Sequence, residues 1–134
     1  MNNLEKKNII VTGATGGIGT SIIKKLSENG ANIIASGTKI EKLEELKKKF
    51  NRIKILKFDI SNHEKIEKFI EDASRELGGN FDCIVNNAGI AQDNLAIRMS
   101  LDEWKKVIDI NLTSTFLICK FAIKNMLKNK KGKI

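Results

Sequence analysis

A cluster of glycines near the amino terminus is the first feature of the sequence with an evident chemistry. It follows an apolar run at 8–11 and precedes a segment whose apolar residues recur at helical spacing as far as Gly30. A glycine turn between a strand and a helix lets backbone N–H groups approach a diphosphate, and the helix N-terminus adds unpaired donors with a partial positive charge. The spacing Gly-x-x-x-Gly-x-Gly in this context predicts a dinucleotide-binding loop. The residues expected to form it are Gly13, Thr15, Gly16, Gly17, Ile18 and Gly19.

The end of the second predicted strand decides between the two nicotinamide dinucleotides. A site for NAD usually has an Asp or Glu there, which accepts a hydrogen bond from the ribose 2′-hydroxyl. This chain has Ser36, Thr38 and Lys39 at that point and no carboxylate before Glu41. Hydroxyls, backbone N–H groups and one ammonium suit a 2′-phosphate, so we predict NADP(H). The alternative is that Thr38 only caps the next helix while Lys39 is solvated, although a capping role does not exclude phosphate contact.

The loops after the third and fourth predicted strands lie where a doubly wound sheet brings chain over its ligand. Asp59, followed by Ile60, could accept a hydrogen bond from the adenine amino group or could cap the following helix, and both roles remain open. The small residues and amides of 86–89 would let a cofactor approach closely, and the alternative is an asparagine-rich turn.

Alternating apolar runs and helical patterns position these loops. The predicted strands are 8–11, 32–36, 53–58 and 81–85. Capping-box patterns predict helices that begin after Thr38, Ser61 and Ser100, each with a Glu three residues later, and His63 is expected at the surface of the second of these helices. Such βαβ units predict an α/β fold, a Rossmann-type doubly wound parallel sheet in the order 3-2-1-4. The chain supplies only the first half of such a sheet, and 132–134 is expected to open a fifth strand.

One long helix is predicted from Ser100 to about Asn129. Its inner side is expected to consist of Trp104, Val107, Ile108, Leu112, Thr115, Cys119, Ala122 and Met126. Further apolar residues at Phe116, Leu117, Phe121 and Ile123 imply partners on a second side.

The composition excludes several classes of protein. The chain has 134 residues, 41% of them apolar, and a net charge of +8. Its lysines are interleaved with glutamates, and motifs for zinc or RNA are lacking, so we predict neither a nucleic-acid partner nor a metal site. No run is long enough to span a bilayer and no signal-peptide pattern is present, so a cytoplasmic protein without membrane contact is expected. Cys83 and Cys119 are predicted to be buried free thiols.

Three motifs in register resemble the short-chain dehydrogenase/reductase family over the whole chain. They are Thr12-Gly13-x-x-x-Gly17-x-Gly19, Asn86-Asn87-Ala88-Gly89 and Asp109-Ile110-Asn111-Leu112. Within that family, 87–99 together with Trp104 resembles the bacterial 3-oxoacyl-[acyl-carrier-protein] reductases of fatty acid synthesis. The resemblance implies an oxidoreductase that uses NADPH as hydride donor, an acyl-carrier-protein-linked substrate, and a tetramer in which the long helix packs between subunits.

The same resemblance implies roles for individual residues. Gly13, Gly17 and Gly19 would hold the diphosphate, Thr38 the 2′-phosphate and Asp59 the adenine. Contact with the adenosine side would come from Asn87, Ala88 and Gly89. Asn111 matches the Asn of the family's catalytic Asn-Ser-Tyr-Lys set, where it supports a helix kink and a proton-relay water. Gly16 is a departure, because relatives often have a basic residue there.

The rest of the catalytic set is missing. The chain has no tyrosine, and its last serine is Ser114. In the family, Tyr donates the proton and Lys lowers its pKa. We therefore interpret 1–134 as an NADP-binding domain truncated before the Tyr-x-x-x-Lys segment, inactive and poorly stable alone, with an unpaired strand edge at 81–85. A dehydrogenase for another alcohol or a sugar, and a non-catalytic NADP-binding module, are the alternatives. A docking surface for acidic acyl carrier protein is predicted at Arg98, Lys128, Lys130, Lys131 and Lys133.

Overall fold

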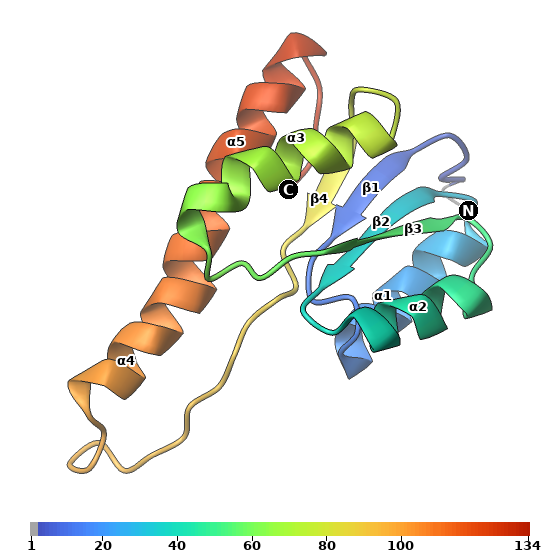
Figure 1. The fold of residues 1–134 in the computed structure, drawn as a ribbon. Coiled ribbons are helices and arrows are strands. Elements are labelled where there is room, and N and C mark those ends of the chain that lie inside the picture. Colours follow the sequence, from blue (N-terminus) through green and yellow to red (C-terminus); the bar gives the residue numbers. More distant parts are fainter. Residues whose placement is uncertain (1–2) are drawn as a thin grey trace.

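Four parallel strands form the sheet, in the order β3-β2-β1-β4. The computed structural model describes residues 3–134 (Figure 1). The strands are β1 (Asn8–Val11), β2 (Asn32–Gly37), β3 (Ile53–Lys57) and β4 (Cys83–Val85). The helices are α1 (Gly17–Glu28), α2 (Ile40–Lys49), α3 (Ile66–Glu76), α4 (Leu101–Ile108) and α5 (Ser114–Lys128). A 3₁₀ turn, His63–Lys65, precedes α3, and a π-helix, Asp109–Thr113, joins α4 to α5. The predicted α/β class and strand order are confirmed.

Helices cover both faces of the sheet (Figure 1). Successive side chains of a strand point to opposite faces, and β1 shows the consequence. Ile9 and Val11 pack in the core beneath α1 and α2, while Ile10 packs in the core beneath α3 and α5. This two-sided burial explains why the strands are continuous apolar runs.

The last residues of the chain pair with the outer edge of β4. Lys133 forms a parallel bridge with Cys83, donates its N–H to the Asp82 carbonyl at 3.0 Å and accepts the Ile84 N–H at 3.1 Å. The predicted opening of a fifth strand at 132–134 is therefore present. The prediction of an unpaired edge is wrong for Asp82–Ile84, because the returning chain already occupies it.

The long helix does not keep a single register. Its start is as predicted, because Ser100 and Glu103 form the reciprocal capping box. The π-helix at Asp109–Thr113 then inserts one residue into the turn, which rotates the following face. The buried residues of α5 are Ser114, Ile118, Ala122 and Met126. The predicted inner side is wrong at Trp104 and Leu112, which are 57% and 63% exposed.

The other two predicted capping boxes do not form. Helix α2 has Lys39 at its N-cap and no side-chain cap, so the Thr38 hydroxyl does not cap this helix. Before α3, the chain enters the 3₁₀ turn, again without a side-chain cap. Here the Asp59 carboxylate accepts the Ser61 N–H at 2.9 Å, which closes a local turn instead.

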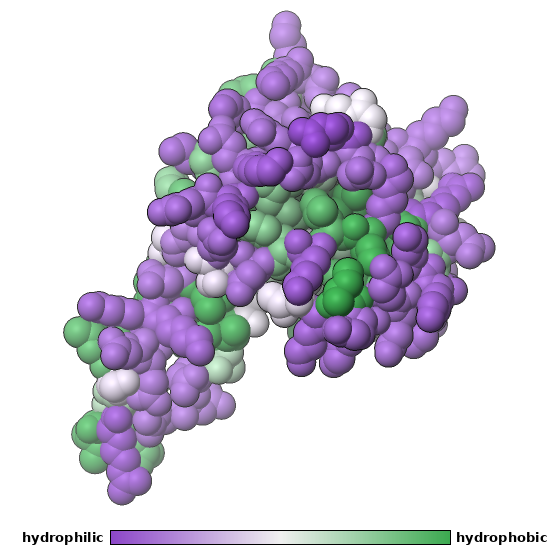
Figure 2. Space-filling view, in the orientation of Figure 1, coloured by the Kyte–Doolittle hydropathy of each residue, from purple (hydrophilic) through white to green (hydrophobic). Residues whose placement is uncertain are grey.

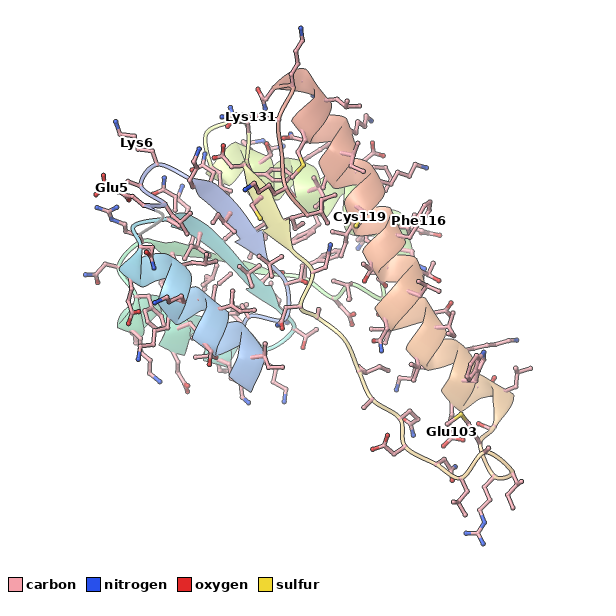
Figure 3. The ribbon with its side chains drawn as sticks, turned by 180° about the vertical axis from the view of Figure 1, so that it is seen from behind. Glu5, Lys6, Glu103, Phe116, Cys119 and Lys131 are labelled. Carbon is pink, nitrogen blue, oxygen red and sulfur yellow. The ribbon has the colours of Figure 1, made fainter. Side chains whose placement is uncertain are left out.

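Helix α4 and the loop at 89–100 project away from the body of the domain (Figure 1). Figure 2 shows hydrophobic side chains on this projecting end, and Leu95, Ile97, Leu101 and Trp104 are all more than half exposed. Phe116 of α5 is 62% exposed on the side turned away from the sheet (Figure 3). No helix within residues 3–134 combines the length and apolar character needed to cross a bilayer.

Both cysteines are free thiols, as predicted. Each is half-buried rather than fully buried. Burial raises the pKa of the Cys83 thiol, which lies in β4. Cys119 faces the sheet (Figure 3), where its sulfur accepts a hydrogen bond from the Asn86 amide at 3.4 Å.

Candidate functional site

A cleft of about 590 Å³ opens at the carboxyl ends of the strands. In an open α/β sheet this edge, where the strand order reverses between β1 and β4, is the usual ligand position. The cleft is lined by four segments that are far apart in the sequence: 12–19 except Ala14, 36–38, 58–61 and 87–90. Lys106 of α4 and Ile110 of the π-helix complete the lining. The residues predicted from the sequence that line it are Gly13, Thr15, Gly16, Gly17, Ile18, Gly19, Ser36, Thr38, Asp59, Ile60, Asn87, Ala88 and Gly89.

Two glycines of the loop are required by packing within the protein. Gly13 has φ +63°, and a Cβ there would lie 2.7 Å from the Ala88 Cα. A Cβ at Gly19 would collide with the Gly13 carbonyl oxygen and lie 2.9 Å from the Ala14 Cα. Neither residue tolerates a side chain, whatever the cleft binds.

The other two glycines have no such internal reason. A Cβ at Gly17 would meet no atom within 4 Å, and one at Gly16 would meet only the Gly13 carbonyl oxygen, at an ordinary 3.7 Å. Both line the cleft at the start of α1, whose N-cap has no side-chain hydrogen bond and whose first turn has no acidic residue. The missing side chains therefore leave space beside free N–H donors, and this arrangement fits a diphosphate group.

A buried threonine joins the glycine loop to the loop after β4. The Thr12 hydroxyl accepts the N–H groups of Asn87 and Ala88 at 3.2 and 3.1 Å. The Asn87 amide donates in return to the carbonyls of Thr12 and Gly13, at 3.2 and 3.0 Å. The Asn87 side chain is thus occupied in fixing the loop, and Ala88 and Gly89 present their backbone to the cleft.

The end of β2 has no carboxylate in the cleft. Ser36 is buried and Thr38 is exposed, and both line it. Lys39 is exposed and does not line the cleft, unlike Ser36 and Thr38, with which it was predicted to contact the phosphate. The end of β2 therefore presents two hydroxyl side chains and no carboxylate to the cleft.

The described lining of the cleft contains one acidic and one basic side chain. Asp59 is the single carboxylate and Lys106 the single ammonium among the described lining residues. The sequence did not reveal Lys106, because a lysine on a charged helix resembles a solvated one. Ile60 and Ile110 supply apolar surface beside them, as a planar base would require.

Asn111 is not part of the cleft lining. Its side-chain oxygen accepts the Ile90 N–H and its amide donates to the Ile90 carbonyl, both at 2.8 Å. Asn111 therefore fastens the loop after β4 to the π-helix.

His63 is half-buried at the surface of the 3₁₀ turn, where it has two partners that the sequence did not predict. Its Nε2 lies 3.0 Å from the buried Ser114 hydroxyl and 3.2 Å from the Asp109 carbonyl. The 3₁₀ turn, which the sequence did not predict, brings its ring against the π-helix. Among residues 3–134, no group of three or more His, Cys, Asp or Glu side chains could hold a metal ion.

The parallel sheet, the glycine loop and the cleft define a Rossmann-type dinucleotide-binding fold. A family model described as short chain dehydrogenase matches residues 7–134, and the chain belongs to this family of oxidoreductases.

Comparison with known proteins gives the same result. A 3-oxoacyl-[acyl-carrier-protein] reductase FabG from Vibrio cholerae is 38% identical over 98% of this chain and 54% of its own length. Nodulation protein G from a Rhizobium species is 36% identical over 100% of this chain and 55% of its own length. A short-chain dehydrogenase/reductase from Brucella melitensis, titled a glucose/ribitol dehydrogenase, has a TM-score of 0.85 and 32% identity, covering 92% of this chain and 53% of that one. The chain therefore spans about half the length of these relatives.

Proposed function

We propose that the chain is the cofactor-binding part of an NADPH-dependent 3-oxoacyl-[acyl-carrier-protein] reductase of fatty acid synthesis. The observation that carries the cofactor choice is the end of β2, where Thr38 lines the cleft and no carboxylate is present. Support for the substrate class comes from the relatives named as 3-oxoacyl-[acyl-carrier-protein] reductases, which are 36–39% identical to this chain. The chain covers 53–54% of the length of each of these relatives.

The described residues have binding and orienting roles in this proposal. The N–H groups at the start of α1 would hold the diphosphate, with Gly16 and Gly17 giving it room. Thr38 would contact the 2′-phosphate, and Asp59 and Ile60 would contact the adenine. When bound, the nicotinamide dinucleotide supplies the hydride, and the protein supplies orientation and the proton. Asn111 holds the loop after β4 through Ile90, and the proton donor would come from a Tyr-x-x-x-Lys segment.

The cofactor choice is tested by titrating the 134-residue chain with NADPH and NADH while nicotinamide fluorescence is recorded. We expect tighter binding of NADPH in the wild type and a shift toward NADH in the Thr38→Asp variant. The new carboxylate would repel the 2′-phosphate and accept from a 2′-hydroxyl. Thr38→Ser is the matched control, because it retains the hydroxyl. Equal or NADH-favouring affinity of the wild type would contradict the proposal.

The coding sequence after Ile134 tests the reductase assignment. An in-frame Ser followed by Tyr-x-x-x-Lys would support it, and the protein that includes this segment would be assayed with carrier-linked 3-oxoacyl substrate. A stop codon in that position would instead favour a non-catalytic NADP-binding module.

The acyl carrier protein would dock where α5 ends. Lys128 and Lys130 are exposed there, but Lys131 forms an ion pair with Asp82 at 3.1 Å. Arg98 belongs to the loop at 89–100, which projects from the body of the domain at the opposite end from the end of α5 (Figure 1). The proposed docking surface is therefore smaller than the sequence predicted, and Lys130 is its clearest test.

A second candidate has a specific observation in its favour. The Brucella structure is titled a glucose/ribitol dehydrogenase and matches this chain with a TM-score of 0.85. A dehydrogenase acting on a sugar or another alcohol would use the same cofactor cleft. Comparing turnover of ribitol and of a 3-oxoacyl thioester by the protein that includes the catalytic segment would separate the two.

A further inference from the structure

The π-helix between α4 and α5 connects the two loops that flank the cleft. On one side, the Asn111 amide is fixed to the Ile90 backbone in the loop after β4. On the other side, Ser114, which is fully buried, donates its hydroxyl to the Ile60 carbonyl at 2.7 Å in the loop after β3. The register of this π-helix therefore sets the position of both loops relative to each other.

A π-helix needs partners that an α-helix does not. The Asp109 carbonyl accepts the N–H of Ser114, five residues later, instead of the N–H four residues later. The same carbonyl also lies 2.9 Å from the Ser114 hydroxyl and 3.2 Å from His63 Nε2. A second donor at this carbonyl, His63, favours the wide turn, because an α-helical register would move the carbonyl away from it.

One arrangement of hydrogens gives His63 and the Ile60 carbonyl their partners, and it leaves the Ser114 hydroxyl without a hydrogen for the Asp109 carbonyl. The Ser114 hydroxyl donates to the Ile60 carbonyl, which is its shortest contact. It then accepts from His63 Nε2–H, whose hydrogen is shared with the Asp109 carbonyl. An imidazole with a hydrogen on Nε2 meets this requirement in its neutral and in its charged form.

We propose that His63 is a positioning residue, which holds the π-helix in the register that directs Asn111 at Ile90. Through this register it fixes the gap between the loops after β3 and β4, and thus the shape of the adenine side of the cleft. This role rests on the proposed binding of NADPH in that cleft. No contact between His63 and the cofactor is involved, since the ring is absent from the cleft lining.

A pair of substitutions separates the hydrogen bond from the volume of the side chain. His63→Gln retains an N–H donor at a similar reach, while His63→Leu retains bulk and removes the donor. Glu64→Gln, at an exposed position on the same 3₁₀ turn, is the control. We expect NADPH affinity to fall about fivefold in the Leu variant, the size of one net hydrogen bond, and to stay within about twofold in the Gln variant and in the control.

Amide hydrogen exchange of the unliganded 134-residue chain gives a readout that does not depend on the cofactor. The Ile90 and Ser114 amides should exchange about fivefold faster in the Leu variant and at the wild-type rate in the Gln variant. Unchanged exchange in the Leu variant, or equal acceleration in both variants, would overturn the positioning role. If the exchange pattern is as expected but the wild type binds neither NADPH nor NADH, the proposed function fails and the positioning role for the π-helix stands.

Discussion

Two substitutions in the glycine loop should separate folding from binding. Alanine at Gly13 must adopt φ +63° and place its Cβ 2.7 Å from the Ala88 Cα. The left-handed conformation costs about 1–2 kcal/mol and overpacking against backbone about 1–3 kcal/mol. We therefore expect Gly13→Ala to lower the free energy of unfolding by about 2–5 kcal/mol, a large part of the usual 5–15 kcal/mol.

Alanine at Gly17 should leave the stability unchanged and weaken NADPH binding. Its Cβ would meet no protein atom within 4 Å, at the first residue of α1. Because alanine favours helix over glycine by up to about 1 kcal/mol, the variant should be as stable as the wild type or slightly more stable. The Cβ would, however, occupy the space proposed for the diphosphate. Losing one or two charged hydrogen bonds would weaken NADPH binding about 10- to 100-fold.

Urea unfolding and a fluorescence titration with NADPH measure the two effects separately. Lys24→Ala, on the exposed face of α1, is the control and should change neither the stability nor the NADPH affinity strongly. If Gly17→Ala binds NADPH as tightly as the wild type, the glycine loop does not hold the diphosphate. If Gly13→Ala unfolds at the wild-type urea concentration, the packing explanation for this glycine is wrong.

Four further predictions concern charge, reactivity and activity. Burial alone would raise the pKa of Asp82, but the Asn8 N–H and the Lys131 ammonium outweigh burial and lower this pKa. The ionised Asp82 therefore stabilises the fold above its unfolded pKa, and this stabilisation is lost as the pH falls. Urea unfolding should show that the Asp82→Asn variant loses less stability than the wild type between about pH 5 and 3. Because burial raises its pKa, the Cys83 thiol should react with iodoacetamide at pH 8 more slowly than free cysteine, as followed by mass spectrometry. In the protein with its catalytic segment, Lys130→Glu should raise the KM for carrier-linked substrate and spare a small thioester; an equal effect on both would contradict docking. The 134-residue chain should not oxidise NADPH with a 3-oxoacyl substrate, since it has no tyrosine, and measurable turnover would show that another proton donor acts.

The sequence was sufficient to predict the sheet and the loops that line the cleft. Continuous apolar runs of four to six residues separated by helical patterns lead to a parallel sheet, because parallel strands need crossover helices and are buried on both faces. The carboxyl ends of such strands meet at one edge, so the glycine loop, Thr38, Asp59 and Asn87 were expected together, and all four segments line the cleft.

The sequence was insufficient wherever two segments distant along the chain define each other's geometry. Periodicity predicts which residues of a helix are apolar, but a π-helix inserts a residue without a local pattern, so Leu112 was placed on the wrong face. Trp104 precedes the π-helix and is exposed because α4 projects away from the body of the domain (Figure 1). Capping boxes at Thr38 and Ser61 had the right residues, yet α2 begins after Lys39 without a side-chain cap, and a turn at Asp59 and a 3₁₀ turn form before α3.

By itself, the sequence determined the class of fold and the chemical types present at the cleft, because both follow from local composition and from the two-residue and 3.6-residue periods of strands and helices. Only the tertiary structure showed that Gly13 and Gly19 are required by packing, whereas Gly16 and Gly17 have room for a Cβ. It also decided that Lys106 lines the cleft, and that His63 bonds to the π-helix. These facts depend on distances between atoms in three dimensions; His63 and Asp109, for example, are 46 residues apart in the sequence. No periodicity within one segment records such a distance.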